Sequence, residues 1–354
     1  MKDSVLYYSV GALLYSPANN ATIYDSIVNQ HFGTKYSLAL CLEDTIRDDC
    51  VQEAQQKLID TLRRIHMRRV SDEFFVPKIF IRVRSPFQIG LLYQQLGEAS
   101  CLVTGFILPK FSLENADAYL QEIIKVNETA LQPVYTMPIY ESASIIDLRS
   151  RFDILYALKD KLSAIEDRVL NIRVGGNDLC HMFGFRRHET ETIHQIQPVA
   201  SIFSDIITVY GMDYVVSGPV WEYYNGPYWK QGLLNEIAMD RLCGFVGKTV
   251  IHPNQIDVVN DAYKVPQKDY ADACAILNWD HHSHLLVSAN SAKERMNEYK
   301  THSNWALRTL LLAESFGVTY HDIPDATVHF APKNNNTIKI PTPQVQPYLY
   351  RFKA

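Results

Sequence analysis

The chain has 354 residues, 47% of them hydrophobic and 21% charged, which is typical of a globular protein that is soluble in water. Its formal net charge of −5 provides no general positive field, which argues against nucleic acid or an anionic membrane as a partner, and no apolar stretch approaches the roughly 18–20 residues needed to cross a bilayer. The six cysteines include no CxxC pair, so free thiols and a cytoplasmic location are expected.

Apolar runs separated by turn signals predict eight β-strands. They lie near residues 12–17, 37–43, 78–84, 102–109, 132–141, 168–176, 214–218 and 247–252. Stretches with helical spacing lie between them, for example 49–67 and 113–128. This alternation favours parallel pairing with right-handed crossovers. A doubly wound open sheet fits the same alternation, but no G-x-G-x-x-G follows the first strand and no Walker A motif is present, so a (β/α)₈ TIM barrel over residues 1–262 is favoured.

The pattern changes after residue 262. Helices are expected near 266–279, 289–300 and 303–316, and residues 319–354 are rich in Pro, Asn, Thr and Gln. Because short helices need packing partners, residues 263–318 are expected to form a helical lid or oligomerisation segment, followed by an extended tail over 319–354. The histidine-rich stretch at 280–284 is interpreted as a polar loop, since no cysteines or spaced acids complete a zinc site.

Two acids follow apolar runs in a way that suggests a metal site. Glu141 closes the run at 133–141, and Asp178 follows the run at 169–174, 37 residues further on. That spacing is close to one strand–helix unit, so the two acids can face each other at adjacent strand ends. Two carboxylates, completed by water and substrate, describe a Mg²⁺ or Mn²⁺ site. The alternative is a structural role, in which Glu141 neighbours a helix N-cap and Asp178 is itself an N-cap.

Charged residues also follow the other predicted strands. Arg82 and Arg84 alternate along one strand, so one is expected to enter the barrel mouth and bind a carboxylate while the other faces away. Glu43 and Asp44 are likewise expected to face opposite ways, one of them orienting Arg82 or holding metal-bound water. For Lys110, an ion pair is favoured over a Schiff-base role.

A basic run follows Asp178 in the same predicted loop region. Arg186 and Arg187 are candidates for binding a phosphate or a second carboxylate. The competing interpretation is a solvated charge run.

Taken in order, these segments resemble the citrate lyase β-subunit-like branch of the HpcH/HpaI aldolase superfamily over residues 10–262. More narrowly, the chain looks like the C–C bond lyase group of that superfamily, which is associated with tellurite-resistance-type gene clusters. The motifs include Leu42-Glu43-Asp44, Ile81-Arg82-Val83, Tyr140-Glu141-Ser142, Gly175-Gly176-Asn177-Asp178 and His252-Pro253. The resemblance implies a TIM barrel with Mg²⁺ held by Glu141 and Asp178, and with Arg82 binding substrate and stabilising charge.

The resemblance also implies a homo-oligomer, a trimer or hexamer, in which a C-terminal lid reaches a neighbour's site. The stretch 296–298 is similar to the lid region, so Glu298 is expected to donate or accept a proton in trans. The chain departs from the family pattern in two places: Arg84 stands where Asn is usual, and residues 7–11 lack the basic residues that usually precede the first strand.

The expected function is a Mg²⁺-dependent lyase or aldolase that cleaves or forms a carbon–carbon bond next to the carboxylate of a 2-oxo or hydroxy acid. In this hypothesis Arg82, Glu43 and Glu298 are catalytic, while Lys110 and the basic pair Arg186 and Arg187 help to bind substrate. The substrate is a small carboxylate, with an acyl-CoA or a phosphorylated compound left open. One alternative keeps the barrel and metal but acts on a phosphorylated or nucleotide-like metabolite; another is a non-catalytic barrel used as a binding or scaffold subunit.

Overall fold

The computed structural model describes residues 2–280 and 283–319. Eight parallel strands follow one another around a barrel in the order β7-β6-β5-β4-β3-β2-β1-β8, and a bridge between Gly218 and Lys248 joins the two ends. The strands are β1 (Ala12–Pro17), β2 (Ser37–Cys41), β3 (Lys78–Arg82), β4 (Val103–Leu108), β5 (Tyr135–Tyr140), β6 (Ile172–Val174), β7 (Val216–Ser217) and β8 (Lys248–Val250). The eight predicted strands and the TIM barrel are confirmed.

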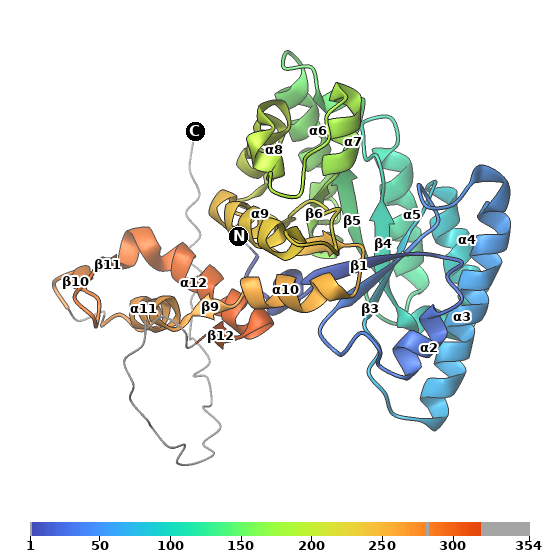
Figure 1. Cartoon of the computed structure of the whole chain (residues 1–354), viewed down its shortest axis with the longest axis horizontal. Coiled ribbons are helices and arrows are strands. Elements are labelled where there is room, and N and C mark those ends of the chain that lie inside the picture. Colours follow the sequence, from blue (N-terminus) through green and yellow to red (C-terminus); the bar gives the residue numbers. More distant parts are fainter. Residues whose placement is uncertain (1, 281–282, 320–354) are drawn as a thin grey trace.

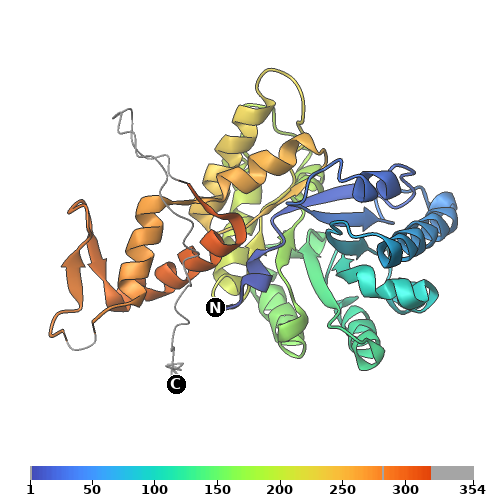
Figure 2. The same cartoon turned by 90° about the horizontal axis from the view of Figure 1, so that it is seen from below.

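Helices surround the strands on the outside of the barrel (Figures 1 and 2). They are α2 (Ile23–Val28), α3 (Val51–Ser71), α4 (Phe87–Leu96), α5 (Ala116–Thr129), α6 (Arg151–Ser163), α7 (Gly176–Phe183), α8 (Gln197–Tyr210), α9 (Trp229–Cys243) and α10 (Asn254–Ala262). In α3 the residues at helical spacing, Ala54, Leu58, Leu62 and Ile65, are buried in the main apolar core. The helices therefore cover the barrel with the apolar faces that the sequence predicts.

A second apolar core fills the inside of the barrel. It includes Leu13, Ala39, Phe80, Ile107 and Met137, each contributed by a different strand and each fully buried. Alternate residues of a strand face opposite sides, so these residues point inward while their neighbours contact the helices. The interior is packed rather than open, which leaves chemistry to the ends of the strands.

The segment after the barrel forms a separate appendage. It contains β9 (Val265–Pro266), α11 (Gln267–Leu277), β10 (Val287–Ala289), β11 (Met296–Glu298), α12 (Tyr299–Phe316) and β12 (Val318–Thr319). The short helix α1 (Val5–Tyr8) precedes the barrel, and Leu311 of α12 packs with Tyr8, Val215 and Val246 at the amino-terminal ends of the strands. Figures 1 and 2 show the appendage extending to one side, with β10 and β11 far from the barrel.

The predicted helix over 289–300 is wrong, because β10 and β11 form an antiparallel hairpin there. The Asn290 side-chain oxygen accepts the backbone N–H groups of Glu294 and Arg295, which closes a turn instead of continuing a helix. Arg295 then pairs with Asp269 and Asp272 of α11, at 2.6 Å in each case. These long-range contacts fix the hairpin against α11.

Several other expectations concern the whole chain. The predicted tail falls outside the described residues from 320 onward, as do His281 and His282 of the histidine-rich stretch. All six cysteines are free thiols. In the described part of the chain, no helix has the length and apolar character needed to span a membrane.

The barrel interior predicts a large effect of mutating Phe80. Phe80→Ala should lower the free energy of unfolding by about 3–5 kcal/mol, because a buried aromatic leaves a cavity that its neighbours only partly fill. Phe87→Ala is the matched control, since Phe87 is 71% exposed and should change stability by less than about 1 kcal/mol. Urea unfolding followed by circular dichroism measures both, and equal losses would contradict the assignment of Phe80 to the core.

Candidate active site

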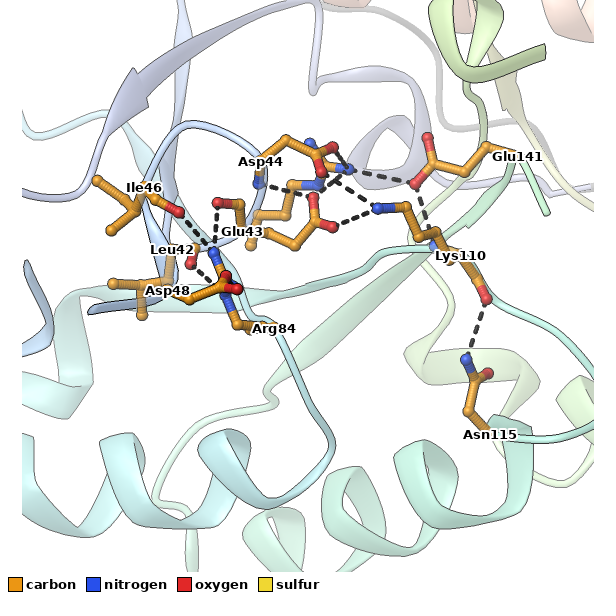
Figure 3. Close-up of polar contacts among 10 residues, drawn as sticks. Leu42, Glu43, Asp44, Ile46, Asp48, Arg84, Lys110, Asn115 and Glu141 are labelled. Carbon is orange, nitrogen blue, oxygen red and sulfur yellow. Dashed lines mark hydrogen bonds and ion pairs between the residues drawn. The ribbon is translucent and has the colours of Figure 1, made fainter. Parts of the chain in front are cut away.

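One guanidinium binds three carboxylates at the carboxyl-terminal end of the barrel. Arg82 is the last residue of β3, and its Nη2 lies 2.8 Å from Glu43 Oε2, 3.0 Å from Asp44 Oδ2 and 3.2 Å from Glu141 Oε1. Figure 3 shows these carboxylates converging from the ends of different strands. The structure thus brings together the predicted residues Arg82, Glu43 and Glu141.

Lys110 joins the same cluster from the turn after β4. Its Nζ lies 2.7 Å from Glu43 Oε1 and 3.1 Å from Asp44 Oδ1, and its backbone N–H donates to Glu141 Oε1 at 3.0 Å (Figure 3). Burial alone lowers the pKa of Lys110, but the hydrogen bonds to Glu43 and Asp44 outweigh it and raise the pKa above its ordinary value. The amine is therefore protonated at neutral pH, which agrees with the predicted ion pair and not with a Schiff base.

Glu43 and Asp44 do not face opposite ways, contrary to the sequence prediction. Strand β2 ends at Cys41, so the alternation of a strand no longer applies to them and both side chains reach Arg82. Burial raises the pKa of Glu43, and its contact with Asp44 adds to the rise. For Asp44 burial acts in the same direction, but the hydrogen bond with Glu43 and the charge of Arg82 lower its pKa to about 2.

Arg84 points away from the carboxylates that Arg82 contacts, but strand alternation is not the reason. Residues two apart on a strand share a face, so the expectation that alternation separates Arg82 from Arg84 is wrong; the two side chains diverge because β3 ends at Arg82. Its guanidinium donates to the backbone carbonyls of Leu42, Glu43 and Ile46, at 3.2, 3.0 and 2.6 Å, and pairs with Asp48 (Figure 3). Arg84 thereby fixes the loop that carries two of the acids. This role could not be predicted from the sequence, because it depends on backbone carbonyl groups.

The second predicted acid, Asp178, is close enough to Glu141 for its charge to raise the pKa of Glu141. Asp178 is the third residue of α7, whose N-cap is Gly175, so the alternative in which Asp178 is itself an N-cap is wrong. An acid in the first turn also stabilises the helix electrostatically. Gly175 is required beside Glu141, since a Cβ at this position would lie only 2.1 Å from Glu141 Oε2.

The environment of Glu141 disfavours its charged form. Burial raises the pKa of Glu141 to about 8, an effect that Arg82 partly offsets and Asp178 reinforces. Among the described residues, no hydrogen bond or ion pair engages the Asp178 carboxylate, nor do three or more His, Cys, Asp or Glu side chains form a group able to hold a metal ion. Two carboxylate oxygens fit Mg²⁺, which keeps several water or substrate ligands, better than a metal that needs a full set of protein ligands.

Arg82 retains an unused donor beside these acids. Its Nε is buried and has no hydrogen-bond partner within residues 2–280 and 283–319. The ring of Tyr15 lies near it, with its centroid 6.0 Å from the guanidinium carbon. Further into the barrel the buried Arg173 donates to Thr249 at 2.6 Å and Asn171 at 3.3 Å. Tyr15 and Arg173 were not predicted as site residues, because in the sequence each shows only as a position within an apolar run.

The other predicted substrate-binding residues are not part of this cluster. Arg187 is 2% exposed, with its Nε 3.2 Å from the buried Glu236, so its guanidinium does not face the barrel mouth. Arg186 is exposed, and its Nε lies 3.6 Å from Glu222. Glu298 ends β11 on the appendage, and its backbone N–H donates to His302 Nδ1 at 3.0 Å. Within one chain, β11, which ends at Glu298, lies far from β3, which ends at Arg82 (Figure 1).

Comparison with known protein families identifies the family. The model of the C–C bond lyase family of the TIM-barrel fold matches residues 4–318. The chain belongs to this family. It is therefore an enzyme of the lyase class, as the sequence motifs predict.

Solved structures show the same fold. A citrate lyase from Burkholderia xenovorans LB400 superposes with a TM-score of 0.63 at 14% identity, over 88% of this chain and 94% of that chain. Protein CitE from Mycobacterium tuberculosis, in complex with magnesium, acetoacetate and coenzyme A, has a TM-score of 0.56 at 18% identity, over 87% of this chain and 99% of that chain. No curated protein sequence matches this lyase.

The raised pKa of Glu141 predicts a dependence of stability on pH in metal-free buffer. Between pH 4.5 and about 8, Glu141 is ionised in the unfolded chain but protonated in the folded one. The folded state then holds the extra proton, so this group makes the protein less stable as pH rises through that window. Glu141→Gln removes this titrating group. As pH rises through the window, the free energy of unfolding of the variant minus that of wild type should increase by up to about 1.4 kcal/mol per pH unit.

Chemical denaturation at several pH values with a chelator present measures this difference. Glu98→Gln serves as the control, because the Glu98 side chain is 94% exposed. Curves for wild type and Glu141→Gln that stay parallel from pH 5 to about 8 would contradict the raised pKa.

Proposed function

We propose that this lyase depends on Mg²⁺ and cleaves or forms a carbon–carbon bond next to the carboxylate of a 2-oxo or hydroxy acid. The observation that carries the proposal is that Arg82 and Asp178 both act on the buried Glu141, while the buried Nε of Arg82 has no partner in the described part of the chain. The Glu141 carboxylate, which only part of one guanidinium offsets, the Asp178 carboxylate, with which no described residue pairs, and the unused Arg82 donor suit a cation together with an anionic substrate.

Glu141 and Asp178 are the residues that would hold the metal. When bound, Mg²⁺ would supply positive charge next to the oxygens of the substrate and would favour negative charge developing there during bond cleavage. It would also hold Glu141 ionised, which burial alone does not.

Arg82 would bind the substrate carboxylate and stabilise developing negative charge. Its Nη2 is already held by Glu43, Asp44 and Glu141, so the guanidinium has a fixed position before substrate arrives. Lys110 is tied to Glu43 and Asp44 and keeps those two acids in place. We assign Lys110 and Glu43 to positioning Arg82, and the direct contact with substrate to Arg82 itself.

The choice of substrates to test comes from this geometry and from the fold relatives. CitE from M. tuberculosis, which shares the fold, was crystallised with magnesium, acetoacetate and coenzyme A. The panel should therefore contain small 2-oxo acids, acetoacetate and acyl-CoAs. A phosphorylated substrate has less support, because burial of Arg187 leaves only Arg186 of the predicted basic pair exposed.

Glu298 requires a second copy of the chain to act at this site. It belongs to β11, which lies far from the barrel (Figure 1). We propose that the appendage of one subunit brings Glu298 to the site of another in a trimer or hexamer. A monomer in light scattering that has full activity would exclude this role.

Magnesium binding is the first prediction of the proposal. Wild type should bind Mg²⁺ in isothermal titration calorimetry, and Glu141→Gln or Asp178→Asn should weaken binding by about tenfold or more, because each removes one charged ligand. Glu98→Gln, on an exposed side chain, should bind as wild type does. If both site variants keep the wild-type affinity and a native circular dichroism spectrum, the metal assignment fails.

The substrate prediction concerns Arg82. In a thermal-shift screen with Mg²⁺, oxaloacetate, pyruvate, glyoxylate, acetoacetate, acyl-CoAs and phosphorylated sugars are compared, and at least one 2-oxo acid should raise the melting temperature. Arg82→Lys keeps a positive charge but loses the fork geometry, so it should abolish that shift and lower turnover by about 100-fold or more. If only phosphorylated sugars raise the melting temperature, the proposed class of 2-oxo acid substrates is wrong and phosphorylated compounds take its place.

A further inference from the structure

A cavity of about 530 Å³ lies at the opposite end of the barrel from Arg82. It is lined by residues that precede the first three strands, by one face of α10 and by the end of α12; among them are Tyr36, Phe75, Lys78, Asn260, Ser315 and Phe316. The volume is within the usual range of small-molecule sites. Neither the predicted strand-end chemistry nor the proposed lyase reaction uses this end of the barrel.

Lys78 is the main polar feature of this cavity. It is largely enclosed, and its Nζ donates only to the carbonyl of Ser9, at 3.3 Å. Within the described residues no acid forms an ion pair with Lys78, and burial lowers its pKa. An enclosed ammonium without a counter-charge is costly for folding, so its presence points to an anion that arrives from outside.

The other lining groups complete a mixed polar and apolar surface. Lysines outnumber aspartates by three to two, and Lys264 is paired with Asp261 at 2.7 Å. Ser315 Oγ is buried and has no hydrogen-bond partner in the described chain. Phe75 lies against Tyr36, with ring centroids 6.2 Å apart. Cationic and hydroxyl groups beside aromatic rings suit a ligand with one anionic group and an apolar or aromatic body.

We propose that this cavity is a second ligand site, which binds a small organic anion whose negative group pairs with Lys78 and whose apolar part packs against Phe75 and Phe316. The site is distinct from the catalytic cluster. Lys78, Phe80 and Arg82 lie on the same face of β3, with Lys78 and Arg82 about 13 Å apart along the strand. Phe80, fully buried between them, closes the barrel interior, so both sites can be occupied together.

The test uses the full-length protein and three simple probes. Benzoate and phenyl phosphate carry an aromatic ring and an anion, and benzyl alcohol is the neutral match. Binding is measured by isothermal titration calorimetry on wild type, Lys78→Met, Lys78→Arg and the surface control Lys230→Met. We expect at least one of the two anions to bind wild type, Lys78→Arg and Lys230→Met. The same anion should bind Lys78→Met at least about tenfold more weakly, and benzyl alcohol should bind wild type more weakly than the anion does.

Two further readouts separate this site from the catalytic one and from misfolding. Arg82→Lys should bind the probe as wild type does, because Arg82 belongs to the other end of the barrel. Lys78→Met should melt at the wild-type temperature or above it, since an enclosed unpaired charge is removed. The proposal is overturned if neither anion binds wild type at about 10 mM, if Lys78→Met or the neutral alcohol binds equally well, or if Arg82→Lys abolishes binding.

Discussion

The contact of one Arg82 nitrogen with three carboxylates is the interaction on which the site depends. Glu43 and Asp44 come from the loop after β2, and Glu141 comes from the end of β5, so the three acids meet only because Arg82 lies between them on β3. Three acids so close together would repel one another and take up protons without a cation among them. Lys110 supplies a second positive charge on the outer side of the same group. The cluster thus holds neighbouring loops in place while leaving Arg82 Nε unused.

Strand β3 shows how charged and apolar positions are distributed along the barrel. On β3 the inward-facing positions are Lys78, Phe80 and Arg82, a cation at each end and an aromatic ring between them. The centre of a barrel has no water to solvate a charge, so it must be apolar, while the ends can hold charges that have partners. Arg82 has carboxylate partners within the chain, whereas Lys78 contacts only the Ser9 carbonyl and pairs with no acid among the described residues. The cluster around Arg82 therefore has its charges paired within the chain, whereas the cavity at Lys78 is the one for which we propose an anionic ligand.

The sequence predicted the features that depend on local pattern. Apolar runs located all eight strands, and charged residues at the ends of those runs located Arg82, Glu43 and Glu141. What it could not predict depends on where an element stops or on distant contacts. Alternation failed for Asp44, because β2 ends at Cys41, and the hairpin replaced a predicted helix through the turn at Asn290. The burial of Arg187 could not be predicted from the sequence either, because its partner Glu236 lies far away along the chain.

The buried partner of Arg187 explains how the barrel closes where its strands are shortest. Strand β7 has two residues and β8 has three, and the two are joined by an isolated bridge. Beside this seam Lys248 Nζ lies 2.8 Å from Glu236 and 2.7 Å from Asp240, both in α9. Arg187 also pairs with Glu236, so two cations balance two carboxylates in a region with almost no solvent.

A set of buried ion pairs restricts geometry even where it adds little net stability, because removing one member leaves another uncompensated. Arg187 follows α7, the helix that carries Asp178. The pair between Arg187 and Glu236 joins the chain just after α7 to α9. The ion pairs beside the seam therefore also hold the segment that follows the helix carrying Asp178.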